Sequence, residues 1–250
     1  HKYGTHIFHT SNKKVWDYIN KFTSFNSYRH QVLASHKEKI YQLPINLETI
    51  NSFFNVNLRP YEVEEFLASK KKSQTSPPAN FEEKAISLIG IELYEAFIKG
   101  YSLKQWQMNP SELPESIFSR MPFRKNYDEN YFYDNWQGIP LEGYHQIFKK
   151  LLSNKKIKVL LDTDYFDIKD QLNTESTLIY SGPIDRFFNY QFGKLSWRTL
   201  NFEKEVIPVE DYQGNTVINF PEVTIPYTRI HEPRHLHPER NYTTEKTVIY

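Results

Sequence analysis

Hydrophobic periodicity changes several times along this 250-residue chain, so neither an all-helical nor an all-strand fold can accommodate it. Apolar residues at helical spacing predict an amphipathic helix near 11–24, capped by Ser11 or Asn12. Residues 47–72 also predict helix, in two pieces broken at Pro60, because proline cannot continue a helix interior. These segments predict helices that bury one apolar face each.

Strand patterns alternate with these helices. Short alternating runs at 31–35 and 39–43 predict a pair of neighbouring strands. Two largely apolar runs, 157–161 and 177–180, predict strands of a parallel sheet buried on both faces. Further strands, expected to be antiparallel, are predicted at 195–202, 216–220 and 227–231.

The middle of the chain carries clear start and stop signals. Asn80, with Glu83 three residues later, predicts the cap of a long helix that runs through Phe97 and ends near Gly100. Prolines interrupt residues 109–125, which predicts a loop with one helical turn in its centre. A further helix is predicted over 143–152. Together the elements predict a mixed α/β (α+β) fold, in which a helical block near 46–120 interrupts a sheet-containing body.

Composition excludes several classes of protein but does not identify the function of the chain. The chain is 39% hydrophobic and long enough to bury a core of one or two compact units. A net charge of +1 gives no field that would recruit nucleic acid or an anionic membrane, so no nucleic-acid partner is expected. Cysteine is absent and no apolar run approaches about 18 residues, so we expect no disulfides, no membrane span and a cytoplasmic location.

The first ten residues indicate an internal fragment. They contain no initiator Met and no signal peptide, and Gly4 stands between an aromatic residue and two histidines, His6 and His9, as in the middle of a site. Taken alone, a turn followed by a short strand with partly buried histidines is the more common interpretation. Motifs farther along the chain, in a fixed order, favour the interpretation of the first ten residues as part of a site. They are 97–106 (FIKGYSLKQW), 119–122 (SRMP), 130–132 (NYF), 181–185 (SGPID), Asn219, and 226–230 (PYTRI).

In this order and at these spacings, the motifs resemble those of UDP-galactopyranose mutases, flavoenzymes that interconvert the pyranose and furanose forms of UDP-galactose. The resemblance runs along essentially the whole chain. It implies a Gly-x-Gly-x-x-Gly loop for the FAD pyrophosphate, which none of the 8 glycines here provides, and a C-terminal region beyond Tyr250. We therefore expect the glycine loop about 45 residues upstream of His1.

The implied fold is an incomplete FAD-binding Rossmann-like domain with an inserted helical bundle and an antiparallel sheet domain. The implied ranges are 1–27 (FAD-binding domain), 28–45 (strands of the sheet domain), 46–120 (helical domain, with a mobile loop at about 109–125), 126–185 (return to the FAD-binding domain), 186–232 (antiparallel substrate domain) and 233–250 (start of the last return to the FAD-binding domain).

The resemblance also implies the binding residues. Arg120 and Arg229 would grip the diphosphate and act in catalysis, since the planar guanidinium fork suits phosphate oxygens, and Arg198 would be a further substrate contact. Phe97, Tyr101 and Ser102 would hold the uracil, Trp106 would lie near the sugar, and Tyr131 and Asn219 would hydrogen-bond phosphate and sugar. His6, Gly182 and Pro183 would contact the flavin.

Three positions depart from the family pattern. Thr5 stands where a smaller residue is usual, Gln107 where Gly is common, and His30, a further substrate contact, where Asn is frequent. These three differences bear on which particular sugar nucleotide is preferred more than on the substrate class.

The implied mechanism uses reduced FAD. Its N5 attacks the anomeric carbon, UDP leaves, and the flavin–sugar adduct opens and recloses as the furanose, so the protein needs no nucleophile of its own. Arg120 and Arg229 would neutralise the departing diphosphate, and closure of the 109–125 loop would exclude water. The implied partners are UDP-galactose and UDP, with a possible homodimer, and the implied setting is galactofuranose for microbial cell-surface glycans.

Two other interpretations carry less weight. A noncatalytic binding module for UDP-sugars or glycans would use the same residues without the missing ends. His235 and His237, with His231 nearby, could bind a metal. Flanking prolines favour an exposed turn there, so no metal site is predicted.

Overall fold

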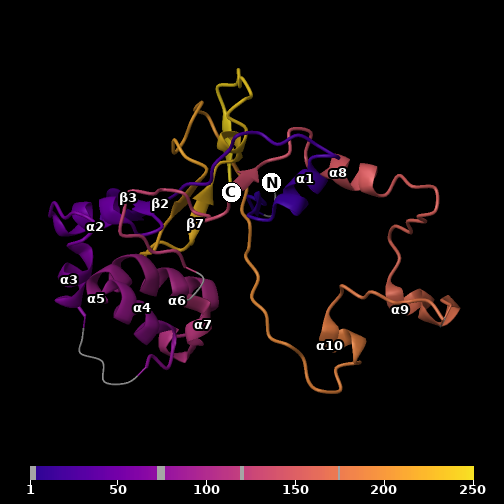
Figure 1. Ribbon diagram of the computed structural model, residues 1–250, viewed down its shortest axis with the longest axis horizontal. Coiled ribbons are helices and arrows are strands. Elements are labelled where there is room, and N and C mark those ends of the chain that lie inside the picture. Colours follow the sequence, from indigo (N-terminus) through magenta and orange to yellow (C-terminus); the bar gives the residue numbers. More distant parts are fainter. Residues whose placement is uncertain (1–3, 72–76, 119–120, 174) are drawn as a thin grey trace.

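A computed structural model describes residues 4–71, 77–118, 121–173 and 175–250 (Figure 1). Helices and strands are mixed along the chain, which confirms the predicted α/β class. The strands are β1 (Phe8–Thr10), β2 (Val32–His36), β3 (Lys39–Leu43), β4 (Trp136–Gly138), β5 (Glu205–Ile207), β6 (Val217–Asn219), β7 (Arg229–His231) and β8 (Thr247–Ile249). The α-helices are α1 (Lys13–Ile19), α2 (Leu47–Phe54), α3 (Val63–Ala68), α4 (Phe81–Ile89), α5 (Ile91–Leu93), α6 (Gly100–Trp106), α7 (Glu115–Phe118), α8 (Tyr144–Leu151), α9 (Tyr165–Ile168) and α10 (Ile184–Phe187). A π-helix, η1 (Tyr94–Lys99), joins α5 to α6, and 3₁₀ turns occur at η2 (Pro110–Glu112), η3 (Lys169–Gln171) and η4 (Pro233–Leu236).

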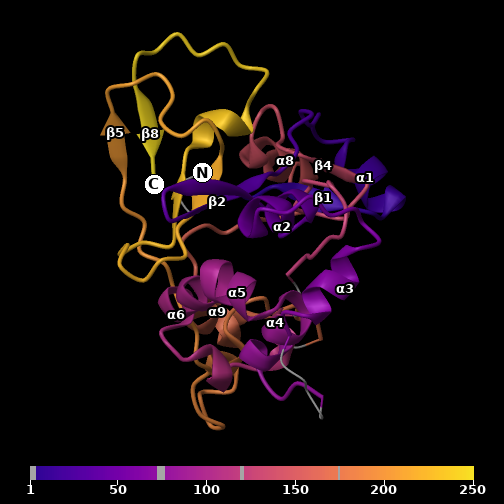
Figure 2. The ribbon, with the colours of Figure 1, turned by 90° about the vertical axis from the view of Figure 1, so that its left-hand side faces the viewer.

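The central sheet has the order β3-β2-β6-β7. β2 pairs with β3 antiparallel and with β6 in parallel, and β6 pairs with β7 antiparallel. The pair predicted at 31–35 and 39–43 is thus confirmed, and so are strands within 216–220 and 227–231, which pair with each other antiparallel. Figure 2 shows the helical block below β2, and the separate β5–β8 pair at the edge of the molecule.

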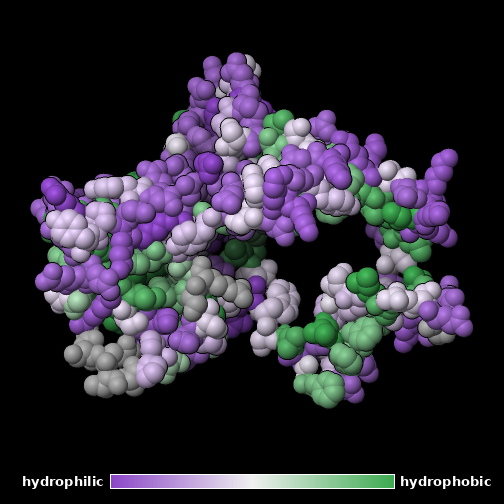
Figure 3. Space-filling model, viewed as in Figure 1, coloured by the Kyte–Doolittle hydropathy of each residue, from purple (hydrophilic) through white to green (hydrophobic). Residues whose placement is uncertain are grey.

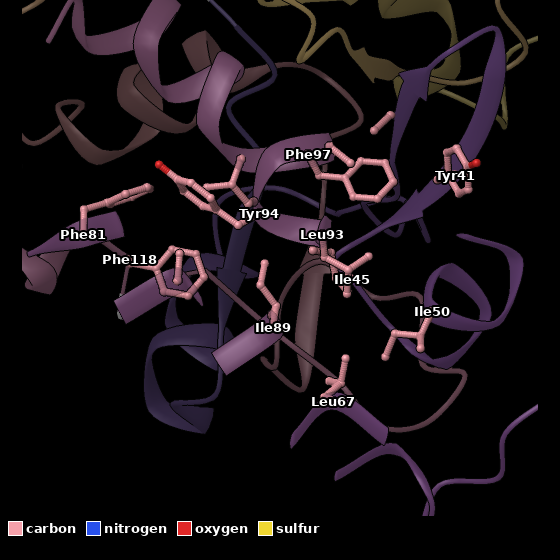
Figure 4. Close-up of a cluster of buried hydrophobic side chains, with 14 of the residues drawn as sticks. Tyr41, Ile45, Ile50, Leu67, Phe81, Ile89, Leu93, Tyr94, Phe97 and Phe118 are labelled. Atoms are coloured by element: carbon pink, nitrogen blue, oxygen red, sulfur yellow. The ribbon is translucent and has the colours of Figure 1, made fainter. Parts of the chain in front are cut away.

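The main core lies inside the helical block. Leu47, Ile50, Leu93 and Tyr94 are fully buried there, together with Ile89 at the end of α4 (Figure 4). Burying an apolar side chain of this size stabilises the fold by about 1.5–3 kcal/mol. This core therefore fixes the helices whose ends and faces carry the candidate site.

Helix caps follow the sequence closely. The Asn12 side chain accepts hydrogen bonds from the backbone N–H of Lys14 and Val15, which confirms one of the two predicted caps of α1. Asn80 Oδ1 accepts from Glu83 N at 2.9 Å, as predicted for α4. The two helical pieces on either side of Pro60 and the helix after Gly143 are also present.

The predicted end of the long helix at Gly100 is wrong. Gly90, at φ +83°, separates α4 from α5, and the helical path then continues through Gly100 to Trp106. Gly100 is buried, and a Cβ there would overlap the carbonyl oxygen of Pro221. The glycine therefore permits a close approach between helix and chain instead of ending the helix.

Residues 152–204 make a long excursion from the body of the molecule, in which α9 and α10 are the only α-helices among the described residues (Figure 1). The strands predicted at 157–161, 177–180 and 195–202 are absent from it, and Leu161, Ile179 and Phe192 are 80%, 90% and 84% exposed. A strand requires a neighbour for its backbone hydrogen bonds, and no described strand lies beside these runs. Figure 3 shows that side chains leave open the space inside the excursion.

The loop predicted at 109–125 contains two short helical turns, η2 and α7, instead of one. Arg120 lies outside the described residues. No helix among the described residues combines the length and apolar character needed to cross a membrane.

Gly100→Ala tests the contact between α6 and Pro221. The added methyl must displace backbone, so we expect the free energy of unfolding to fall by about 1–3 kcal/mol in a denaturant titration. Gly100 has φ −68°, which any residue adopts, so the loss reports the contact and not backbone strain. The small gain in stability expected of a glycine-to-alanine change inside an unobstructed helix would contradict the close contact.

Candidate functional site

A cavity of about 360 Å³ lies between the helical block and the central sheet. Its walls come from α4, η1, α6 and α7 on one side, and from β2, the end of β6 and the start of β7 on the other. The predicted binding residues that line it are His30, Phe97, Tyr101, Ser102, Trp106, Tyr131, Asn219 and Arg229. The fold thus gathers side chains from four separate parts of the sequence around one space, and their roles stay predictions.

Arg229 provides the positive charge at the cavity. It is the first residue of β7, pairs in register with Asn219 of β6, and donates from Nη2 to the Tyr101 hydroxyl. Its guanidinium carbon is also 5.6 Å from the centroid of the Tyr101 ring. Among the described residues that line the cavity, no other Lys or Arg is present. The tyrosine of α6 therefore holds the guanidinium at the cavity.

His30 is a buried neutral group. Its Nδ1 lies 2.9 Å from the Tyr28 hydroxyl, which donates to Thr216 Oγ1 at 2.8 Å. Burial lowers the pKa of His30 to about 4, and the charges of Arg229 and His9 act in the same direction. The imidazole is therefore uncharged at neutral pH and leaves Arg229 to set the charge of the cavity.

Two amide oxygens of the cavity lining are buried without a hydrogen-bond partner among the described residues: Asn219 Oδ1 and Gln105 Oε1. An unsatisfied buried acceptor costs about 1–3 kcal/mol, so each favours a ligand that brings a hydroxyl or N–H donor. Both residues line the cavity. Gln105 was missed from the sequence, although it lies four residues after Tyr101 on α6, which places both on one helical face.

Phe132 is a second residue that sequence reasoning did not assign. Its ring stacks on the His9 imidazole, with centroids 3.7 Å apart, and lines the cavity. His9 Nδ1 lies 2.6 Å from Asp134 Oδ2, and this hydrogen bond is the largest cause of the lowered pKa of Asp134. His9, held by Asp134, therefore packs against the Phe132 ring that forms part of the cavity wall. The predicted motif 130–132 was the only sequence signal for it.

Several predicted residues lie elsewhere. Arg198 is exposed and donates from Nε to the Trp106 carbonyl at 2.9 Å, so it is next to the cavity without lining it. The carbonyl of His6 accepts from the Tyr144 hydroxyl of α8. Gly182 and Pro183 precede α10 on the excursion, so the three predicted flavin contacts do not come together (Figure 1).

Two of the departures from the family pattern have clear places. Thr5 lines the cavity. Gln107 adopts a left-handed conformation, φ 52°, as the cap that ends α6. Glycine adopts this conformation without strain, which explains physically why a glycine suits that position.

One cluster outside the cavity has metal-binding residue types. Asp211, Glu232 and His235 offer ligand atoms within 4.8 Å of one another in the described structure. Glu232 is fully buried and already accepts from the backbone N–H of Tyr212 and Gln213 and from the Thr247 hydroxyl. The cluster is accounted for by these contacts. The exposed turn predicted around His237 is wrong, because His237 is buried and its Nδ1 lies 2.7 Å from Glu239 Oε1.

The neutral state of His30 predicts a pH dependence of stability. Burial lowers the pKa of His30 and of His231 to about 4, below the usual 6.5, so the unfolded chain binds more protons between these values. The free energy of unfolding should therefore decrease as the pH falls from 6.5 towards 4. Chemical denaturation at several pH values should give a shallower dependence for His30→Asn than for the parent chain. Replacement of the exposed His145 is the control, and an unchanged slope in His30→Asn would contradict the assignment.

Comparison with known proteins connects this geometry to a family. The family model described as GLF, UDP-galactopyranose mutase, matches residues 96–250. A probable UDP-galactopyranose mutase of Klebsiella pneumoniae is 42% identical over 250 residues, which cover 100% of this chain and 64% of that protein. A dTDP-fucopyranose mutase of Escherichia coli is 40% identical, with coverage of 100% and 67%. The chain therefore spans about two thirds of the length of these curated relatives.

A solved structure agrees at the level of the fold. The crystal structure of a reduced UDP-galactopyranose mutase aligns with a TM-score of 0.58 and 15% identity, over 98% of this chain and 62% of the other. The matched residues 96–250 include most of the side chains around the cavity, from Phe97 on η1 to Arg229 on β7. The chain belongs to the UDP-galactopyranose mutase family.

Proposed function

We propose that this chain is the sugar-nucleotide-binding part of a mutase that interconverts UDP-galactopyranose and UDP-galactofuranose. The observation that carries the proposal is the cavity itself, where Arg229, held by Tyr101, lies in register with the unsatisfied amide of Asn219. A nucleoside diphosphate sugar needs a cation for its phosphates, an aromatic face for its base and polar groups for its hexose. The cavity has all three.

Each side chain has a defined task in this proposal. Arg229 would bind the diphosphate by charge-assisted hydrogen bonds and stabilise the charge that develops as UDP departs. Tyr101 would stack on the uracil, with Ser102 beside it and Trp106 nearer the sugar. Phe97 is mostly committed to the core, because its ring packs against Tyr41 and Phe53 at 5.1 and 5.5 Å.

The remaining polar groups would contact the hexose and the phosphates. Asn219 and Gln105 would accept hydrogen bonds from donors of the ligand, which removes the cost of their buried oxygens. Burial raises the pKa of Tyr131, so its hydroxyl stays protonated and can donate to a phosphate oxygen. His30, uncharged, would contribute a hydrogen-bonding ring nitrogen without adding charge.

The three predicted flavin contacts lie apart in the described structure. His6 lies against α8, whereas Gly182 and Pro183 lie on the excursion, and none of the three lines the cavity. We propose FAD for the longer protein of which this chain would be a part, where the reduced cofactor would supply the nucleophilic nitrogen. The tasks assigned here to Arg229, Tyr101 and Asn219 concern the nucleotide sugar and do not depend on where the flavin lies.

Two alternatives to this proposal are a noncatalytic binding module and a mutase with a different nucleotide sugar as its substrate. Membership of a mutase family argues against a noncatalytic binding module. The E. coli relative named for dTDP-fucopyranose makes a thymidine diphosphate sugar the relevant competitor of UDP-galactose. The galactofuranose role in cell-surface glycans, the cytoplasmic location, the homodimer and the division into domains all stay predictions.

Removal of the Arg229 guanidinium tests the proposed nucleotide site. UDP added to the chain should quench its tryptophan fluorescence to saturation, because Trp106 lines the cavity. Arg229→Ala should weaken UDP binding by about 10- to 100-fold, the value of a charge-assisted contact worth about 1.5–3 kcal/mol. Arg240→Ala, which removes a guanidinium bonded to the Leu141 carbonyl, should bind as the parent chain does. Equal affinity of the parent and Arg229→Ala would refute the assignment.

The loss of UDP affinity in Arg198→Ala can be compared with that in Arg229→Ala. Arg198 donates to the Trp106 carbonyl but does not line the cavity, so Arg198→Ala should weaken UDP binding by less than about fivefold. A loss as large as that of Arg229→Ala would mean that Arg198 enters the site when the ligand binds. Parallel titrations with dTDP should rank the two bases for this chain.

A further inference from the structure

The ammonium group of Lys104 is surrounded by backbone carbonyl oxygens. Nζ donates to the carbonyls of Phe220, Glu222, Ile225 and Tyr227, at N···O distances from 2.5 to 3.0 Å. An ammonium has three protons and accepts no hydrogen bond, so four oxygens around it use its full donor capacity. One side chain of α6 thereby ties together almost the whole of segment 220–228.

Segment 220–228 is the connection between two strands of the central sheet. β6 ends with Asn219 immediately before it, and β7 begins with Arg229 immediately after it. The two residues are paired in register, and Phe220 N donates to Thr228 O at 2.9 Å to close the base of the connection. The conformation of this segment therefore affects where the Asn219 amide and the Arg229 guanidinium lie.

The same helix carries the other half of the cavity. Tyr101, Gln105 and Trp106 lie on α6 with Lys104, and Tyr101 accepts a hydrogen bond from Arg229. Gly100, one turn earlier, allows the helix to approach Pro221. The contacts of Lys104 thus join the elements that carry the aromatic and the cationic parts of the cavity.

The ammonium is held by dipoles instead of by an acidic side chain. Burial lowers the pKa of Lys104, while the charge of Glu222 acts in the opposite direction. The Glu222 carboxylate itself accepts from the backbone N–H of Lys37 at 3.0 Å and lies 3.8 Å from His36 Nδ1. The geometry is that of a positioned cation that orders a segment of chain.

We propose that Lys104 is a positioning residue for sugar-nucleotide binding: through the 220–228 carbonyls, it holds Asn219 and Arg229 in register with Tyr101. This inference rests on the proposed function for its ligand, but its structural part can be tested without any ligand. Methionine at 104 keeps much of the apolar stem and removes the ammonium, so the carbonyls lose their shared donor.

The ligand-free experiment is hydrogen exchange followed by mass spectrometry. Lys104→Met should raise exchange of backbone amides in 217–231 at least several-fold, with little change in α2 and α3. Lys99→Met is the matched control, because Lys99 lies on the neighbouring helical turn and its ammonium pairs with Glu95 of the same helix, at 3.8 Å. Exchange in 217–231 that is the same in both variants would overturn the proposal.

Chemical rescue separates the ammonium from the side-chain volume. The chain contains no cysteine, so Lys104→Cys has a single thiol. Alkylation of the unfolded variant with 2-bromoethylamine replaces the missing length and ammonium by a thioether analogue of lysine. After refolding, the alkylated chain should regain the parent's slow exchange in 217–231. Alkylation with iodoacetamide, which leaves a neutral side chain, should not restore it, and equal rescue by both reagents would contradict a role for the charge.

UDP titrations then test the functional part. Lys104→Met should weaken UDP binding about tenfold in the parent chain but cause little further loss in Arg229→Ala, because both changes act on one contact. Additive losses would mean that Lys104 does not act through Arg229. If the parent chain does not bind UDP while exchange still responds to Lys104→Met, the proposed function fails for this chain and the structural role of Lys104 stands.

Discussion

The close approach of helix α6 to the segment between β6 and β7 is the contact on which the rest of the site depends. A glycine at position 100 removes the side chain that would keep the helix away from Pro221, and the Lys104 ammonium satisfies the carbonyls that the approach buries. Both contacts hold α6 close to the segment that joins Asn219 to Arg229. The cavity is the part of this interface that side chains do not fill.

Arg229 is the one charged residue among the described residues that line the cavity. Most of its wall is apolar or aromatic, Arg229 brings the cation, and burial keeps His30 neutral. Burial raises the pKa of Tyr28 to about 12, so the hydroxyl that holds His30 also stays uncharged. The polar groups around the ligand space are therefore fixed donors and acceptors whose charges do not change near neutral pH.

Local signals in the sequence predicted local structure well. Asn12 and Asn80 cap helices because a cap depends on only a few neighbouring residues. Gly100 misled because the reason for it, the Pro221 carbonyl, lies far away in the sequence. The apolar run 157–161 has strand composition, but strand formation also requires a paired neighbour. For the site, resemblance identified Tyr101, Asn219 and Arg229, whereas Gln105 and the stack of Phe132 on His9 became evident only from their surroundings.

The excursion at 152–204 has a consequence for the behaviour of the chain in solution. Its runs around Leu161 and Ile179 are exposed, rich in strand-forming side chains and free of regular backbone pairing in the described structure. Such segments can add to one another edge to edge between molecules, with the backbone of one chain as template for the next. The exposed strand-forming surface of the described chain is thus concentrated in a region that forms no part of its cavity.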